Sequence, residues 1–267
     1  MVDAPRRLAR MAGAAAIAAA ALTSASVAQA APSAPADEVN PYIVGGEDAD
    51  IADYPFTVRL TTADGQQFCG GSLVSPTKVL TAAHCTTGSQ ASDVKVVSGR
   101  TVMSSNEGTV SDVTNIWVHP EYQDAAKGFD VSVLTLGAPV QEAPIELAPA
   151  PDDPTYAEGT PATVLGWGAT SEGGEQSDHL QKVDVPVTSD QTCKGAYQEY
   201  DPAGMVCAGV PEGGLDSCQG DSGGPMIADN KLIGVVSWGQ GCAREGYPGV
   251  YARVGAYYDE IMAQVNS

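Results

Sequence analysis

The stretch CQGDSGGP, from Cys218 to Pro225, holds one acid, one serine and three glycines within a single octapeptide. Taken alone, it fits either a tight turn or a loop that presents Ser222 as a nucleophile. A nucleophilic serine needs a general base within hydrogen-bond reach, and that base needs a group that orients it. The rest of the sequence must therefore supply both before Ser222 can be interpreted.

Histidine is the side chain that most often serves as such a base. His84 ends the apolar run LTAAHC and precedes Cys85, so a disulfide at Cys85 would fix the backbone that carries the imidazole. An ordinary packed or surface histidine is the alternative interpretation. We prefer that alternative for His119 and His179, and we predict His84 as the base.

An acid that could orient His84 occurs in the run GFDVSVLTL. Asp130 is the lone acid at the start of this apolar strand, and burying an unpaired carboxylate is costly. We therefore expect Asp130 to have a partner, and His84 is the natural one. A solvated aspartate at a strand start is the alternative.

The glycines of the octapeptide have a physical purpose if Ser222 reacts. Gly220 frees the backbone so that its N–H and that of Ser222 can point at one spot, where they would stabilise a developing oxyanion. Gly223 and Gly224 allow the chain to pass close by on the other side. Alone, the motif GDSGGP could be an ordinary loop. Its occurrence together with LTAAHC and DVSVL is very specific for a catalytic serine.

These motifs occur in a characteristic order: IVGG (Ile43 to Gly46), LTAAHC, DVSVL, CQGDSGGP, VSWGQGC and PGVY. In this order the chain from Ile43 to its C-terminus resembles the chymotrypsin-fold serine proteases, and is most similar to the secreted bacterial trypsins. The resemblance implies that Ser222 attacks the scissile carbonyl, that His84 transfers its proton and that Asp130 orients His84. It also implies an oxyanion hole formed by Gly220 and Ser222.

The resemblance assigns the substrate-binding residues as well. Asp216, six residues before Ser222, matches the base of the primary pocket and would favour Arg or Lys side chains through charge-assisted hydrogen bonds. It could instead be one of the many surface acids, but its spacing from Ser222 and Cys218 argues against that. The remaining matches are a polar pocket residue, two glycines of the pocket walls and a strand that pairs with the substrate backbone: Ser217, Gly239, Gly249, and Ser237–Trp238–Gly239.

The chain has six cysteines, an even number that predicts three disulfides in an oxidising compartment. Metal binding is less favoured, because no pair shows CxxC spacing. The sequence alone does not choose among the possible pairings. The resemblance implies Cys69–Cys85, Cys193–Cys207 and Cys218–Cys242.

IVGG after a polar segment implies a zymogen, although a simple strand start would give the same letters. By resemblance, cleavage between Tyr42 and Ile43 frees an ammonium group at Ile43 that pairs with Asp221 and orders the site. Tyr42 is a departure from the pattern, because a protease with Asp216 in its pocket should not cut after tyrosine. We therefore expect another protease to activate the chain.

The order of segments predicts a secreted protein. Residues 1–30 have a basic start, a short apolar core and a small-residue cleavage site, which together predict a signal peptide. The Arg6–Arg7 pair alone does not distinguish twin-arginine export from the general route. Residues 31–42, rich in Pro, Ala and acids, are predicted to be a propeptide, and residues 43–267 the protease domain.

Within that domain we predict an all-β fold. Short β-branched runs separated by turn residues favour antiparallel strands, and the Pro- and acid-rich segment 148–160 divides them into two sets. We expect a first barrel over about 43–150, a second over about 155–254, a cleft between them and a C-terminal helix over about 254–266. The resemblance implies six-stranded Greek-key barrels with the active site in that cleft.

The net charge of −20 excludes nucleic acid as an expected partner, since such a surface repels phosphates. Residues 1–42 carry three arginines and three acids, so their removal leaves the charge unchanged. We expect no membrane partner, no cofactor and no bound metal, and a monomer. Asp190 fits one position of a calcium site known in bacterial trypsins, but Met205 and Arg253 stand near where further acids would be expected.

The function predicted is a secreted, trypsin-like serine endopeptidase, made as a zymogen, that cuts after Arg or Lys through an acyl-enzyme. Its expected partners are protein or peptide substrates, an activating protease and proteinaceous inhibitors. The alternative is a catalytically inactive homologue that acts as a binding protein, although such homologues usually lack a catalytic residue that is present here. A third possibility keeps the enzyme but changes its extended specificity.

Overall fold

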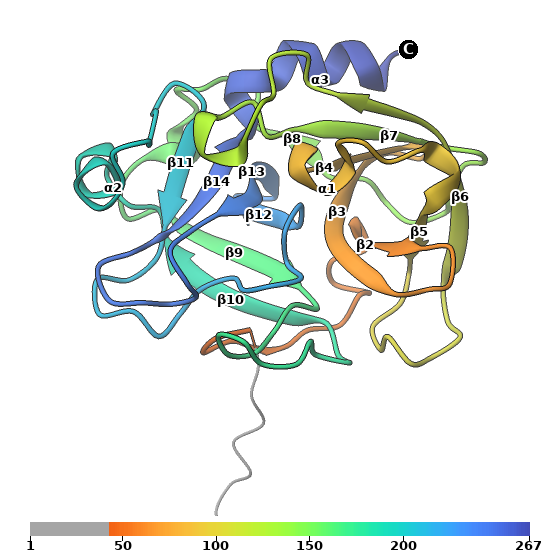
Figure 1. Cartoon of the computed structure of the whole chain (residues 1–267), viewed down its shortest axis with the longest axis horizontal. Helices are drawn as coiled ribbons and strands as arrows, with labels where there is room; N and C mark the ends of the chain where they lie inside the picture. Colours follow the sequence, from red (N-terminus) through yellow and green to blue (C-terminus); the bar gives the residue numbers. More distant parts are fainter. Residues whose placement is uncertain (1–42) are drawn as a thin grey trace, which may run out of the picture. The chain divides into compact units, whose positions relative to one another are not determined.

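The computed structural model describes residues 43–267, so the predicted signal peptide and propeptide lie outside the described residues. The described chain is built mostly from strands, with few and short helices, which confirms the predicted all-β class. In Figure 1 the strands gather into two sheets, β2 to β7 in one and β9 to β14 in the other.

The first sheet is a closed six-stranded barrel with the order β2-β3-β4-β7-β6-β5. Its interior is filled by alternate side chains of these strands, such as Val58, Leu60, Leu73 and Leu134, all fully buried. The strands are β2 (Thr57–Thr62), β3 (Gln67–Ser75), β4 (Lys78–Thr81), β5 (Val94–Ser98), β6 (Thr109–Val118) and β7 (Ser132–Leu136).

The second sheet follows the path β10-β9-β12-β13-β14-β11. A single bridge between Val187 and Ala208, with a hydrogen bond of 2.9 Å from Thr188 N to Cys207 O, joins its two edges into a barrel. The strands are β9 (Pro161–Gly166), β10 (Gln181–Pro186), β11 (Met205–Ala208), β12 (Pro225–Ala228), β13 (Lys231–Trp238) and β14 (Gly249–Arg253).

Two short strands from the part of the chain expected in the first barrel join the second sheet instead. β1 (Glu47–Asp48) pairs with β10, and β8 (Glu146–Leu147) pairs in parallel with β13. Both lie at the ends of the predicted first half, so the chain enters and leaves the first barrel through contacts with the second.

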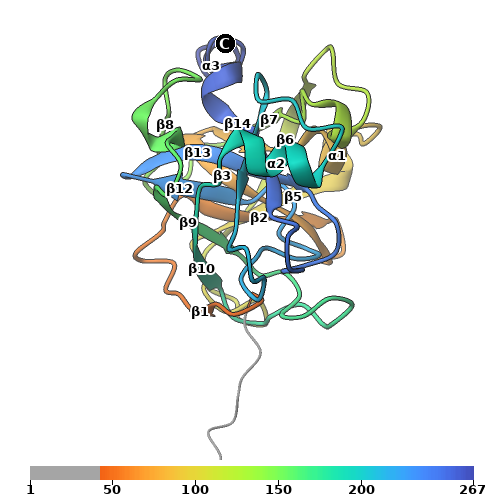
Figure 2. The same ribbon diagram turned by 90° about the vertical axis from the view of Figure 1, so that its left-hand side faces the viewer.

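The helices of residues 43–267 are short. α1 (Ala83–Thr86) follows β4 directly, α2 (Asp190–Ala196) faces the viewer in Figure 2, and α3 (Tyr258–Val265) carries the C-terminus. The predicted C-terminal helix is confirmed, although its first turn is a 3₁₀ turn. The four 3₁₀ turns are η1 (Ala91–Asp93), η2 (Ala125–Lys127), η3 (Pro154–Tyr156) and η4 (Val254–Tyr257).

The two barrels meet at the octapeptide. Gly70 N in β3 donates a hydrogen bond of 2.7 Å to Ser222 O. A Cβ atom on Gly70 would lie 3.0 Å from the Cα of Gly224, so the two backbones touch. The serine is thus held where both barrels contribute neighbours. Among residues 43–267, no helix is long and apolar enough to cross a membrane.

Candidate active site

His84 and Asp130 form a doubly hydrogen-bonded pair. Asp130 accepts from the His84 backbone N–H at 2.8 Å and lies 2.8 Å from the Nδ1 atom of the imidazole. Asp130 is only 1 % exposed, whereas the His84 side chain is partly open to solvent. Because a carboxylate can only accept, Nδ1 donates, and Nε2 is left free to take a proton.

Asp130 is held by more than histidine. Ser237 Oγ, from β13 of the second barrel, donates to Asp130 Oδ2 at 2.5 Å. The sequence assigned Ser237 only to the strand that pairs with the substrate backbone, and its hydrogen bond to Asp130 appears only in the structure.

The backbone before Asp130 adopts an unusual conformation. Phe129 has a φ of +57°, a region that bulky side chains rarely adopt. It is fixed by a hydrogen bond of 2.9 Å from its N–H to Tyr257 Oη and by stacking on the His119 ring, with the centroids 4.9 Å apart. His119 is thus a packed histidine, as we preferred, and burial lowers its pKa. His179 lies on the second barrel beside Asp48, with 3.7 Å between Nδ1 and the carboxylate.

Ser222 is brought next to the helix that carries His84. Gly223 has a φ of +79°, and a Cβ on it would lie 2.6 Å from Gly70 O and 3.1 Å from the Ala82 N that precedes α1. Only glycine allows this approach. Among the described residues the Ser222 hydroxyl makes no hydrogen bond, including none to the His84 imidazole.

Three N–H groups of the octapeptide have no acceptor in the part of the chain that the structure describes: those of Gln219, Gly220 and Ser222. The neighbouring N–H groups of Asp221, Gly223 and Gly224 are all satisfied, at 2.8–3.0 Å. Gly220 has a φ of +100°, which a side chain would strain. The predicted pair of donors is therefore available to an external oxygen.

A cavity of about 140 Å³ opens beside Ser222. All six predicted substrate-binding residues line it, together with the predicted nucleophile Ser222 and the Cys218–Cys242 disulfide, and with Gln219, Val236 and Gly241, which the sequence did not assign to it. The full lining is Asp216, Ser217, Cys218, Gln219, Ser222, Val236, Ser237, Trp238, Gly239, Gly241, Cys242 and Gly249.

Asp216 is a buried acid in this cavity, and none of the described cations forms an ion pair with it. Its carboxylate accepts from Ser217 N at 2.8 Å and from Ala243 N at 3.0 Å. Burial nevertheless raises the pKa of Asp216 to about 6, because these hydrogen bonds offset only part of the desolvation. The cavity therefore offers a cationic ligand an unpaired carboxylate.

A side chain would have different effects at the two glycines predicted to form the cavity walls. A Cβ on Gly249 would lie 2.6 Å from Asp216 Oδ1, so a side chain there would displace the carboxylate. A Cβ on Gly239 would have no neighbour closer than 3.9 Å, so it would only narrow the cavity.

A support for the cavity wall was not foreseen. Tyr197 is the residue that follows α2. Its ring packs against the Trp238 ring with 4.8 Å between the centroids, and its hydroxyl donates to Pro248 O at 2.9 Å. Nothing in the sequence around Tyr197 signals this contact, because it depends on where the chain that follows α2 meets Trp238 of β13.

Ile43 and Asp221 are both fully buried, and Ile43 packs among the apolar residues of the second barrel. Asp221 accepts from Gly168 N at 2.8 Å and Cys218 N at 2.9 Å, and Val44 packs against Ala169, Cys218 and Cys242. Burial raises the pKa of Asp221 to about 7. Among residues 43–267, Asp221 has no cationic partner.

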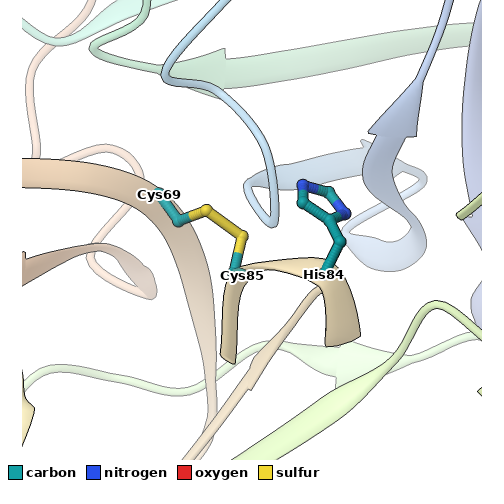
Figure 3. A group of neighbouring side chains, drawn as sticks. All are labelled: Cys69, His84 and Cys85. Atoms are coloured by element: carbon teal, nitrogen blue, oxygen red, sulfur yellow. A yellow bond between two sulfur atoms is a disulfide. The ribbon is translucent and has the colours of Figure 1, made fainter. Parts of the chain in front are cut away.

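The chain contains three disulfides with the pairing that the resemblance implies, and no described cysteine is free. Figure 3 shows Cys69–Cys85 beside His84, which comes from the same short helix as Cys85. These three side chains cluster as metal ligands would. Because a disulfide cannot supply thiolates, the cluster is a structural support for His84 rather than a metal site.

Arg253 lies beside Asp190, the residue that fits one position of a calcium site. Its guanidinium is 3.2 Å from the Asp190 carboxylate and also donates to the carbonyls of Met205 at 2.9 Å and Pro151 at 3.0 Å. A positive charge of the protein itself thus already neutralises Asp190.

Comparisons with known proteins agree with this geometry. The family described as Trypsin matches residues 43–261. A protein named Trypsin from Saccharopolyspora erythraea is 75 % identical over 225 residues, covering 84 % of this chain and 99 % of the relative. Trypsin 5G1 from Aedes aegypti is 43 % identical, covering 82 % of this chain and 83 % of the relative. Trypsin from Squalus acanthias is 40 % identical, covering 84 % and 96 %.

Proposed function

This chain belongs to the trypsin family of serine endopeptidases, and we propose that it is a secreted enzyme that cuts peptide bonds after Arg or Lys. The observation that carries the specificity is the buried carboxylate of Asp216 in the cavity beside Ser222. A cavity of this size accepts a long side chain, and a guanidinium or ammonium group would supply the partner that Asp216 lacks.

The reaction proceeds through an acyl-enzyme. Ser222 Oγ attacks the carbonyl carbon while His84 Nε2 takes its proton, and His84 then gives that proton to the leaving amine. Asp130, which accepts from Nδ1, holds the tautomer that leaves Nε2 basic and stabilises the imidazolium that forms. Water then attacks the acyl-enzyme with His84 as the base again.

The negative charge that develops on the carbonyl oxygen is stabilised by the N–H groups of Gly220 and Ser222. Their lack of acceptors within the described chain supports this role, because such donors need no reorganisation when the charge appears. The substrate backbone pairs with Ser237–Gly239 as an added strand, which aligns the scissile bond with Ser222.

The enzyme is made as a zymogen. Cleavage before Ile43 creates an ammonium group that pairs with Asp221, and this pair acts as a switch because Asp221 also accepts from Gly168 N and Cys218 N beside the cavity. Tyr42 before the cleaved bond does not suit a pocket with Asp216, so another protease activates the chain. Incubating purified precursor with the active form tests this point: rapid conversion would refute it.

Secretion rests on residues 1–30, which read as a signal peptide. Outside the cell the partners are protein substrates, the activating protease and proteinaceous inhibitors that fill the cavity. Neither nucleic acid nor a membrane is a partner, and the enzyme works as a monomer.

The experiment that tests the function is cleavage profiling of residues 43–267 on a mixed peptide library. We expect cuts after Arg and Lys, and Ser222→Ala should reduce turnover by roughly 10⁴–10⁶-fold. A catalytically inactive binding protein would show no cleavage beyond that variant. Asp216→Ser should abolish the Arg/Lys preference while attack continues, and an unchanged preference would remove Asp216 from its role.

A further inference from the structure

Two arginines lie in one groove of this acidic protein without a carboxylate partner. The groove, of about 300 Å³, lies on the first barrel and is lined by β2, the turn after it, β5 and the loop before β6. Arg59 and Arg100 both line it. We call it the arginine groove and define it by Arg59, Lys95, Arg100 and Val110.

The absence of a partner sets these two residues apart. Within residues 43–267 the other arginines, Arg244 and Arg253, each form an ion pair with an acid. Lys95 in the arginine groove is likewise paired, with Asp112. Within the described residues, the two guanidinium groups are the cations of the groove that form no ion pair, and the nearby Asp178 offsets part of the charge of Arg59.

Arg59 is unusually buried for an arginine, at 5 % exposure. One of its terminal nitrogens donates to Met103 O at 3.2 Å, but its buried Nε has no acceptor in the described part of the chain. Burial and the nearby Arg100 both lower the pKa of Arg59. The adjacent acid, Asp178, accepts instead from Ser104, at 2.8 Å from the backbone and 2.7 Å from the hydroxyl.

Burying a charge without a full set of partners is unfavourable, and an anionic ligand would offset that cost. Arg100 is bound only through its Nε, which donates to Glu107 O at 2.6 Å. Two guanidinium forks close together suit a carboxylate, which they can hold through paired hydrogen bonds.

Val110 indicates that the ligand is a peptide rather than a small ion. At 58 % exposure it is the one large apolar side chain recorded as exposed among the described residues, and it lines the same groove. A free inorganic anion would leave this apolar surface in water. An acidic residue with an apolar neighbour would use both features.

The arginine groove lies close to the catalytic turn. Thr61, which also lines it, pairs in register with Gln67, and Gln67 Nε2 donates to Gly220 O at 3.3 Å. The cavity with Asp216 and the strand Ser237–Gly239 hold the residues up to the cleaved bond. Residues after the bond therefore leave Ser222 on the side of Gln67, toward the arginine groove.

We propose that the arginine groove binds an acidic residue with an apolar neighbour in the part of a protein substrate that follows the cleaved bond. The proposal rests on the proposed function for the direction in which the substrate runs. It adds a second recognition site. This site prefers acidic side chains, whereas the cavity with Asp216 prefers Arg or Lys side chains.

The test compares two peptides with the same Arg–X bond and no other basic residue. One carries a Glu-Glu-Val extension after the bond, and the other carries Gln-Gln-Val. We expect kcat/KM to be about 5- to 10-fold higher for the acidic peptide, and this advantage should shrink at high salt. Arg100→Gln should abolish the advantage. Lys182→Gln, which removes one positive charge from β10, should retain it.

A short Arg substrate without an extension separates the two proposals. Its kcat/KM should not change in Arg100→Gln, and its complete lack of turnover in the parent enzyme would refute the proposed function instead. Equal rates for both extended peptides, or equal loss of the advantage in both variants, would overturn the arginine groove as a peptide site. So would Arg100-dependent binding of inorganic phosphate without any preference for the acidic peptide.

Discussion

At the scale of single residues, the candidate site depends on a few side chains whose surroundings give them unusual properties. Asp216 is the example with the most direct consequence, because burial in the cavity raises its pKa to about 6. A cationic ligand binds the ionised carboxylate, so binding requires the loss of that proton.

We therefore predict that the affinity for a small aromatic amidine decreases below pH 6. Below the pKa of the free carboxyl group, the affinity should fall about tenfold for each pH unit, because one proton must leave for each ligand bound. Titration of the ligand by calorimetry between pH 5 and pH 8 measures this. Asp216→Asn should bind weakly at every pH, and an affinity of the parent enzyme that stays constant to pH 5 would contradict the assignment.

Gly220 gives a second prediction at this scale. Gly220→Ala should lower kcat by about 10²–10³-fold, because a side chain strains its φ of +100° and a Cβ would lie 3.2 Å from the Cα of Gly168, which would move a donor of the oxyanion hole. Steady-state kinetics on an Arg substrate measures this. Gly159→Ala is the matched control, since Gly159 has a φ of +83° in open space and should cost stability only.

At the scale of elements, α1 is the shortest α-helix among residues 43–267, and it matters most for the candidate site because it carries His84. It has only four residues and no side-chain cap, so it does not hold His84 by itself. The Cys69–Cys85 disulfide ties it to β3, and β3 also contacts Ser222 through Gly70. Base and nucleophile are thus positioned by the same strand.

Replacing both Cys69 and Cys85 by alanine should therefore affect stability and kcat together. The loss of a loop-closing disulfide should cost about 3 kcal/mol, measured by urea unfolding, and looser placement of His84 should lower kcat. The pair Cys193 and Cys207 closes a loop of similar length, with a sequence separation of 14 against 16. Its removal should cost similar stability and act mainly on KM, through Tyr197 and Trp238. Equal effects on kcat would contradict this account.

At the scale of the whole molecule, the site exists only where the two barrels meet. His84 and Asp130 come from the first barrel, Ser222 and the cavity come from the second, and Ser237 bonds across to Asp130. The segment at Ile43 is packed into the second barrel, next to the residues that hold Asp221. The proposed cleavage before Ile43 would therefore act close to the residues that hold Asp221.

This arrangement predicts that processing changes how stability depends on pH. In the uncleaved chain the pKa of Asp221 is raised from 3.8 to about 7, so the folded state binds a proton that the unfolded state has lost. This contribution makes the free energy of unfolding rise as pH falls from about 7 toward 4. In the cleaved chain the ammonium group of Ile43 favours the ionised carboxylate, and the contribution should vanish.

Urea unfolding of both forms at pH 5 and pH 8 measures the difference. Asp216 titrates in both forms, so its contribution cancels in the comparison. Asp221→Asn should give the uncleaved chain the flatter dependence of the cleaved one. If the two forms show the same pH dependence, Asp221 is not the partner of the new N-terminus.

The sequence by itself determined the family, the all-β class and the cavity with Asp216, because short motifs such as CQGDSGGP and LTAAHC encode local backbone requirements. Alternation of apolar residues also located most strands. Four strands do not show this pattern: β1 and β8 have only two residues each, QFCGGSLVS in β3 has two glycines in its middle, and Met205–Ala208 of β11 is uniformly buried.

Only the tertiary structure decided the contacts between segments far apart in the chain. The bond from Ser237 to Asp130, the support of Trp238 by Tyr197, the pairing of Arg253 with Asp190 and the meeting of Arg59 with Arg100 are all of this kind. They depend on how each barrel closes and on how the two barrels pack together. Sequence periodicity reports which face of an element is buried, but not which residue of a distant element it meets.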